Sequence, residues 1–181
     1  MQINSETLLN DLTKRVEQAM RDVSAFKQLS ETQLNYKTSP TSWSILECLE
    51  HLNLYGDFYL PEIEKRILAQ AANTQTPIFK SGVLGNYFAN MMSIEQNKIK
   101  KIKSPADKNP LNSDLKVTTI DRFLKQQDTL LYLLNQARQV NLTKTKCSIS
   151  ISKWVTIRLG DTFRFLIYHI ERHVLQAKNV L

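Results

Sequence analysis

The residues best suited to chemistry in this chain are its three histidines, His51, His169 and His173. His169 and His173 lie four positions apart in a segment that reads as one helix, so their side chains project from the same face about one turn apart. Two imidazoles with this spacing can bind one metal ion, and a third from another helix would complete a set of three nitrogen ligands. The spacing therefore predicts a divalent-metal site, provided that the fold brings His51 to the other two.

Each histidine also has a plainer interpretation. A single half-buried histidine is more often a hydrogen-bonded structural residue than a ligand, and pairs spaced by four also occur on solvated helix faces. Glu171 projects about 100° away from His169 around the helix, so the chain does not match the zinc-hydrolase pattern with its glutamate base. Cys48, one turn before His51, is a candidate soft ligand, although a helical cysteine is usually a small core residue.

Length and composition indicate one helical domain over residues 1–181. The chain has only four glycines, and its two cysteines form no C-x-x-C pair, so neither a zinc ribbon nor a redox motif is indicated. We see no secretory signal and no apolar stretch of about 18 residues. We therefore expect a soluble cytoplasmic protein without a membrane segment.

The net charge of +7 raises the question of nucleic-acid binding. The densest basic run extends from Lys98 to Lys103 and precedes Ser104-Pro105, where a helix should end. Lysines in a last turn complement the helix dipole, and no nucleic-acid-binding motif accompanies them. The run is thus interpreted as a helix end rather than a phosphate-binding patch, and a nucleic-acid partner is not expected.

Apolar residues spaced by three and four predict an all-α chain. In the first half we expect a helix over Ser5–Leu29, then a loop, then a helix that begins after Ser44 and continues to about Ala71. Ser44 and Glu47 match a capping box, in which each side chain bonds the backbone N–H of the other residue. Pro61 should kink or break the second helix near Leu60.

In the second half we expect a weaker third helix over Val83–Lys103, a loop over Ser104–Asp114 and a fourth helix over Thr119–Val140. The stretch Cys147–Ser152 alternates polar and apolar residues over a few positions, which would also fit a short extended segment, and we interpret it as loop. Asp161 is expected to cap the last helix, Thr162–Asn179.

Helical projection places all three histidines beside the apolar stripes of their helices, where a core meets an open edge. Three further residues lie on the same side, each with two interpretations. Gln176 either bonds a ligand or substrate or faces solvent, and Tyr55 either lines a cleft or, as we favour, packs in the core. Glu47 is either a nearby carboxylate base or, as we favour, part of the capping box.

Two segments resemble the DinB-like proteins, the damage-inducible four-helix-bundle family. Trp43-Ser-Ile-Leu-Glu-Cys-Leu-Glu-His-Leu52 is similar to that family's W-S-x-x-E-x-x-x-H-L segment, and the last helix carries its H-x-x-R-H-x-x-Q pattern from His169 to Gln176. The start of the fourth helix, from Thr119 to Phe123, also fits. The resemblance extends over nearly the whole chain, and the two histidine segments are its specific part.

The resemblance implies a four-helix bundle with a long crossover connection and one additional short helix. It implies that His51, His169 and His173 bind one divalent ion, zinc or nickel, and that the protein is a homodimer. Characterised relatives include thiol transferases, so we expect a metal-dependent S-transferase that acts on a small molecule through a metal-bound thiolate or water, with a low-molecular-weight thiol as co-substrate. A metal-dependent hydrolase is the other enzyme class that such a site would suit. The alternative is a non-catalytic, stress-associated helical bundle whose metal only braces two helices.

Overall fold

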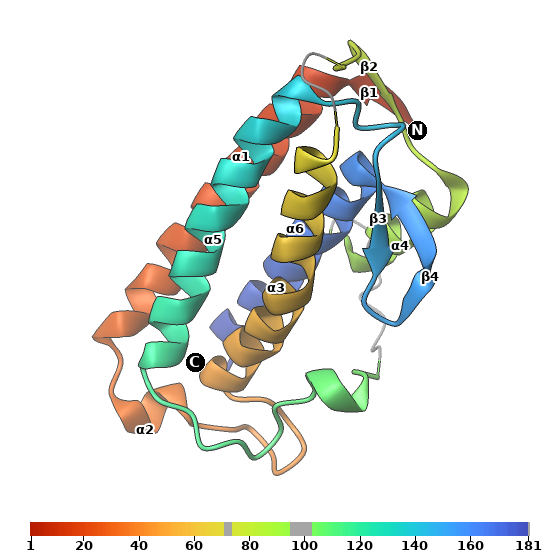
Figure 1. The fold of residues 1–181 in the computed structure, drawn as a ribbon. Helices are drawn as coiled ribbons and strands as arrows, with labels where there is room; N and C mark the ends of the chain where they lie inside the picture. The colour runs from red at the N-terminus through yellow and green to blue at the C-terminus, as the bar shows by residue number, and fades with distance from the viewer. Residues whose placement is uncertain (71–73, 95–102, 181) are drawn as a thin grey trace.

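Four long helices lie side by side in the computed structural model, which describes residues 1–70, 74–94 and 103–180 (Figure 1). They are α1 (Ser5–Ala25), α3 (Ile45–Leu68), α5 (Thr118–Gln136) and α6 (Leu159–Lys178). Both α1 and α3 pack against α5 and α6, so the four helices close around one core. This arrangement confirms the predicted all-α class and bundle architecture.

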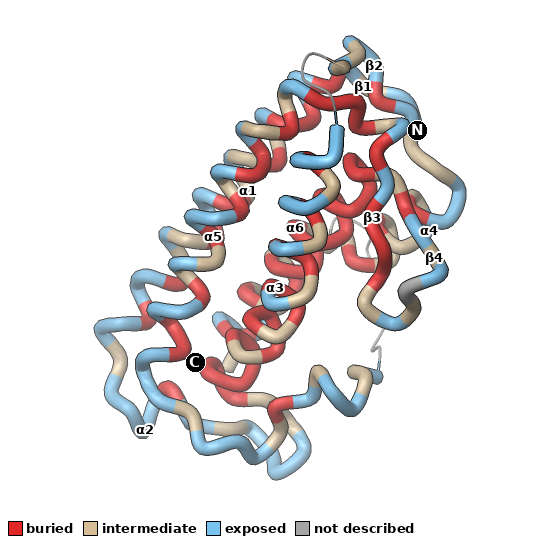
Figure 2. The backbone as a smooth tube through the Cα atoms, viewed as in Figure 1, coloured by how far each residue is buried: buried red, intermediate tan, exposed pale blue. Residues whose placement is uncertain are grey.

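The core is formed by the apolar stripes that the sequence predicted. Leu12 and Val16 of α1, Phe123 of α5 and Phe163 of α6 are all fully buried. Figure 2 shows that α1 and α5 alternate between buried and exposed residues, whereas burial is more extensive on α3 and α6. Helices α3 and α6 are therefore the most enclosed pair, and they carry the histidines.

The predicted start of α3 is confirmed. Ser44 is the N-cap residue, its hydroxyl accepts a hydrogen bond from the Glu47 N–H, and the Glu47 carboxylate accepts one from the Ser44 N–H. Of the kink or break predicted near Leu60, the break is wrong, because α3 is continuous from Ile45 to Leu68 with Pro61 inside it. Pro61 is exposed, whereas Tyr59 and Ile63 on either side are buried. Their packing outweighs the local cost of one missing backbone hydrogen bond.

The long connection from α3 to α5 confirms the predicted crossover. It contains β2 (Ile78–Lys80), the short helix α4 (Val83–Met92) and the 3-10 turn η2 (Ala106–Lys108). Helix α4 packs on α6 and ends well before the predicted Lys103. Most of the lysine run lies outside the described residues. The remaining short helical pieces are α2 (Glu31–Leu34), η1 (Phe26–Gln28) and η3 (Ala137–Gln139).

Two small antiparallel strand pairs were not predicted. Strand β1 (Gln2–Asn4) pairs with β2, and β3 (Lys146–Ile149) pairs with β4 (Ser152–Arg158). The loop prediction after Cys147 is therefore wrong. The alternation seen in the sequence is that of a true strand, but it is too short to be distinguished from loop without the partner strand.

The predicted cap of α6 is also wrong. The helix begins at Leu159, its N-cap residue is Arg158, and Asp161 lies fully buried inside the first turn. The Asp161 carboxylate accepts hydrogen bonds from the Ser81 hydroxyl and the Gly82 N–H, which precede α4. Asp161 therefore ties α4 to α6. No helix in the described part of the chain has the length and apolarity needed to cross a bilayer.

Candidate metal centre

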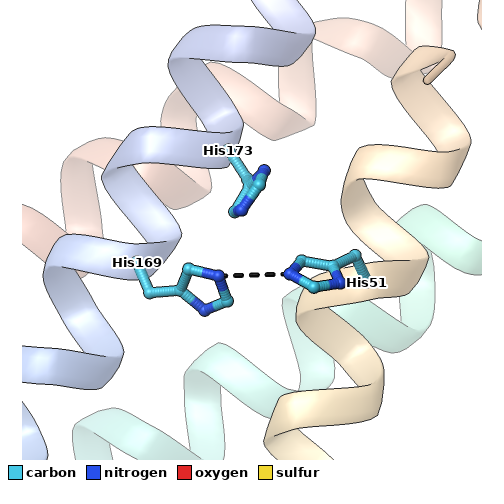
Figure 3. A group of neighbouring side chains, drawn as sticks. All are labelled: His51, His169 and His173. Carbon is cyan, nitrogen blue, oxygen red and sulfur yellow. Dashed lines mark hydrogen bonds between the residues drawn. The ribbon is translucent and has the colours of Figure 1, made fainter. Parts of the chain in front are cut away.

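The three histidines meet between α3 and α6. His51 projects from α3, and His169 and His173 project from successive turns of α6 toward it (Figure 3). The Nε2 atoms of His51 and His169 are 3.2 Å apart, and one nitrogen from each of the three rings lies within 4.8 Å of the others. The fold thus brings together the residues that the spacing singled out.

Hydrogen bonds on the outer ring nitrogens of His51 and His173 fix which nitrogen of these two rings faces inward. His51 Nδ1 lies 2.6 Å from the backbone carbonyl oxygen of Lys108, which can only accept, so Nδ1 carries the proton and Nε2 carries a lone pair. His173 Nδ1 likewise lies 2.9 Å from Gln176 Oε1. Outer-ring hydrogen bonds of this kind orient ligating histidines and raise their basicity.

The donor set and its spacing fit a divalent ion. With Zn–N bonds of about 2.0–2.1 Å, neighbouring nitrogens in a tetrahedral site stand about 3.3–3.4 Å apart, close to the spacing of the His51 and His169 nitrogens. His169 Nδ1 is buried and has no hydrogen-bond partner among the described residues. A buried polar ring without full hydrogen bonding destabilises a fold, and it is therefore typical of a functional position.

Burial keeps the three imidazoles neutral at neutral pH. It lowers the pKa of His51 to about 4 and of His173 to about 3. It also lowers the pKa of His169 well below its ordinary value, with smaller contributions in the same direction from the other two histidines and Arg172. Neutral imidazoles are the form that binds metal ions, so the three rings need lose no proton to act as ligands.

Metal-free protein is expected to lose stability as the pH falls below about 6.5, where histidines of the unfolded chain begin to take up protons. The folded chain takes up the same protons only at pH 4 or below at His51 and His173. The free energy of unfolding should therefore fall by about 1 kcal/mol per histidine for each pH unit between about pH 6 and pH 4.

Urea unfolding of metal-free protein at pH 7 and pH 5 measures this loss. A His169→Leu variant, which has one buried histidine fewer, should lose less stability over the same interval. Equal losses in the variant and the wild type would contradict the assignment of His169 as a buried neutral base.

Aromatic rings surround the cluster on the protein side. The Trp43 ring lies 4.7 Å from His51 and 5.5 Å from His173, measured between ring centroids. The Tyr55 ring lies 5.0 Å from His51 and 4.5 Å from His169, and Phe165 stacks on His169 at 5.8 Å. Burial raises the pKa of Tyr55 to about 12, with smaller contributions from Tyr59 and Asp107.

The open side of the cluster faces a cavity of about 630 Å³. All three histidines line it, as do Tyr55 and Gln176, which the sequence had placed on this side. Gln176 is exposed to solvent, and its Oε1 atom lies 2.9 Å from His173 Nδ1, so the two interpretations of this residue are compatible. The other lining residues are Thr41, Ser42, Trp43, Met92, Lys103, Ser104, Pro105, Arg172, Leu175 and Asn179.

Glu47 and Cys48 lie outside this cavity. The Glu47 carboxylate completes the capping box and also accepts hydrogen bonds from the Lys37 ammonium and the Asn112 N–H. Cys48 is buried in the apolar core, where burial raises the pKa of its thiol to about 12. The chain therefore uses Glu47 to hold the loop before α5, and Cys48 for packing.

Sequence reasoning missed the way in which that loop supports the site. Trp43, Glu47 and His51 follow one another at intervals of four residues, and each bonds the segment from Lys108 to Asn112. The Trp43 indole donates to Asn109 Oδ1 at 3.2 Å. The spacing of four was visible in the sequence, but nothing local identified the loop as the shared partner.

Comparison with known proteins agrees with this geometry. A family model described as the DinB superfamily matches residues 12–177, a span that includes all three histidines and all four long helices apart from the first residues of α1 and the last of α6. No curated protein and no solved structure matches the chain. Because the family model extends over most of its length, the chain belongs to the DinB superfamily.

Proposed function

We propose that His51, His169 and His173 hold one divalent ion, zinc or nickel, and that the adjoining cavity receives a small-molecule substrate. The observation that carries this proposal is the convergence of three neutral imidazoles on one wall of a cavity. Three nitrogen ligands from the protein leave coordination positions for a further ligand, which is the pattern of catalytic rather than structural zinc sites.

We further propose that the protein is a metal-dependent enzyme of the thiol S-transferase type. When bound, the ion would supply Lewis acidity, which stabilises a thiolate or lowers the pKa of a water. The chain's own residues would orient the ligands through Lys108 and Gln176 and exclude water through Trp43, Tyr55 and Phe165.

The cavity wall favours a transferase over a hydrolase. Hydrolysis at such a site benefits from a carboxylate base close to the water. Among the described residues that line the cavity there is no aspartate or glutamate, and the Glu47 carboxylate is used in the cap and the loop contacts. A thiolate needs no such base once its proton is lost, which makes thiol transfer the better match.

Metal binding can be tested with the protein's own fluorescence. The chain has two tryptophans: Trp43 lies beside the histidines, and Trp154 is 96% exposed. In a Trp154→Phe variant without a histidine tag, one equivalent of nickel should quench Trp43 emission, whereas closed-shell zinc should compete with nickel without quenching. Elemental analysis of the dialysed protein should give one ion per chain, and a small fraction of an ion would overturn the proposal.

Turnover separates the enzyme from the non-catalytic bundle. Zinc- or nickel-loaded protein is mixed with a panel of low-molecular-weight thiols and an electrophilic dye substrate. A rate above background that His51→Ala abolishes supports the transferase. Loss of stability in His51→Ala, with no rate in either protein, supports a metal that only braces α3 and α6.

We also propose a homodimer. Three large apolar side chains stand exposed on α4 and β4: Val83 is 94% exposed, Tyr87 62% and Trp154 96%. Helix α4 contacts β4, so these side chains stand on neighbouring elements, and a contiguous exposed apolar patch favours a protein partner. Light scattering on the eluted protein measures the mass in solution, and a monomer at all concentrations would overturn this part of the proposal.

A further inference from the structure

The hydroxyl group of Tyr55 is not bonded by any residue in the described part of the fold. Tyr55 is only 7% exposed, and its ring lies against both His51 and His169. Within residues 1–70, 74–94 and 103–180 its hydroxyl makes no hydrogen bond, yet it is not among the polar atoms that are sealed from solvent. Since Tyr55 lines the cavity beside the histidines, that hydroxyl is available to a molecule in the cavity.

Tyr59, on the same helix, is a tyrosine whose hydroxyl is hydrogen-bonded within the protein. It lies one turn after Tyr55, with the two rings stacked at 6.2 Å and 12°. Tyr59 is 1% exposed, and its hydroxyl accepts a hydrogen bond from the Ser150 N–H in the β3–β4 turn at 3.2 Å. A phenylalanine at position 55 would fill the same space without an unpaired hydroxyl, so packing alone does not explain a tyrosine there.

The charges on the cavity wall indicate what this hydroxyl would meet. The charged side chains that line the cavity, apart from the histidines, are Lys103 and Arg172. The Asp107 carboxylate makes a smaller contribution to the raised pKa of Tyr55, but neither it nor another carboxylate of the described part of the chain lines the cavity. A divalent ion at the histidines would add further positive charge. Positive charge and hydroxyl or amide donors together complement an anionic oxygen, for which a phenolic O–H is a strong hydrogen-bond donor.

We propose that the cavity binds small molecules carrying a carboxylate or similar oxyanion, and that the Tyr55 hydroxyl donates a hydrogen bond to that oxygen beside the three-histidine centre. This inference rests on the proposed metal site and specifies the class of ligand that it accepts. Trp43, Met92 and Leu175 on the same wall would cover an apolar body attached to the oxyanion.

Benzoate is a suitable probe, with benzamide as its neutral counterpart. Calorimetric titration of zinc-loaded protein should show benzoate binding more tightly than benzamide. In Tyr55→Phe the affinity for benzoate should fall about tenfold or more, because a hydrogen bond to a charged group is lost. The unfolding temperature of Tyr55→Phe should not fall, because no hydrogen bond within the described protein is removed.

Tyr59→Phe is the matched control, since it removes one hydroxyl from the neighbouring buried tyrosine. It should lower the unfolding temperature, because the Ser150 N–H loses its acceptor, and it should leave the affinity for benzoate unchanged. An equal loss of benzoate affinity in both variants would assign the effect to packing and overturn the inference.

The zinc content of each sample separates this inference from the proposed function. Absence of zinc from the wild type would overturn the metal site and the inference together. One zinc per chain in all proteins, with benzoate binding equally to wild type and Tyr55→Phe or not binding at all, would overturn only the inference about Tyr55.

Discussion

Zinc or nickel at about a thousand times its dissociation constant is expected to raise the unfolding temperature of the wild-type protein by about 10 °C, and that of a His169→Leu variant not at all. Only the folded chain brings the three imidazoles together, so the ion binds the folded state and stabilises it by mass action. The Nε2 atom of His169 lies 3.2 Å from that of His51. Differential scanning fluorimetry with and without the ion measures both shifts.

In metal-free protein, His169→Leu should not lower the free energy of unfolding. His169 is 2% exposed, and its Nδ1 atom lacks a partner among the described residues. Leucine has a similar volume and no polar atom to bury, so metal-free His169→Leu should be at least as stable as metal-free wild type. A variant that is much less stable without metal would mean that His169 serves packing rather than ligation.

Gln176→Ala provides a graded control for this experiment. It keeps all three imidazoles and removes only the group that His173 Nδ1 contacts. Removing such an outer partner typically weakens metal affinity by about 10- to 100-fold. The thermal shift should therefore persist in Gln176→Ala but require correspondingly more metal.

Asp161→Ala is expected to lower the free energy of unfolding by about 3–5 kcal/mol, the usual cost of removing one partner of a buried ion pair. Asp161 is fully buried, and Arg164, which donates to it at 3.1 Å, is 3% exposed. The variant would leave the Arg164 charge buried and deprive Ser81 and Gly82 of their acceptor. Urea unfolding at pH 7 measures the loss.

Lys178→Ala is the matched control for Asp161→Ala. Lys178 also lies on α6 and pairs with Asp22 at 3.2 Å, but its side chain is 48% exposed. Pairs of this kind contribute between about 0 and 1 kcal/mol. If Asp161→Ala costs no more than Lys178→Ala, the carboxylate does not anchor α4 to α6.

The sequence predicted what local periodicity encodes. The four long helices follow from apolar spacing, and the capping box at Ser44 and Glu47 follows from a pattern four residues long. The convergence of His51 with His169 and His173 followed from the side of each helix on which they project, together with the family resemblance. The helices and the cap depend on neighbours within one or two turns, whereas the convergence of the histidines also needed the resemblance.

Features made by distant partners were not predictable in the same way. Strand β1 has three residues, and its partner β2 lies more than 70 positions later, so no local pattern marks either one. Asp161 had the residue type and position of a cap, but the backbone that it bonds belongs to Gly82. The break predicted at Pro61 is wrong because the sequence shows the hydrogen bond that a proline removes but not the packing around it.

The ring of His51 is oriented by a main-chain carbonyl rather than by a side chain. Every amino acid carries the same carbonyl, so the residue at position 108 can drift during evolution without loss of that hydrogen bond. Asn112 is more restricted, because its φ of 65° favours asparagine or glycine. Such a scaffold holds the His51 ring in place whichever side chains stand in the neighbouring wall at Ser104 and Pro105.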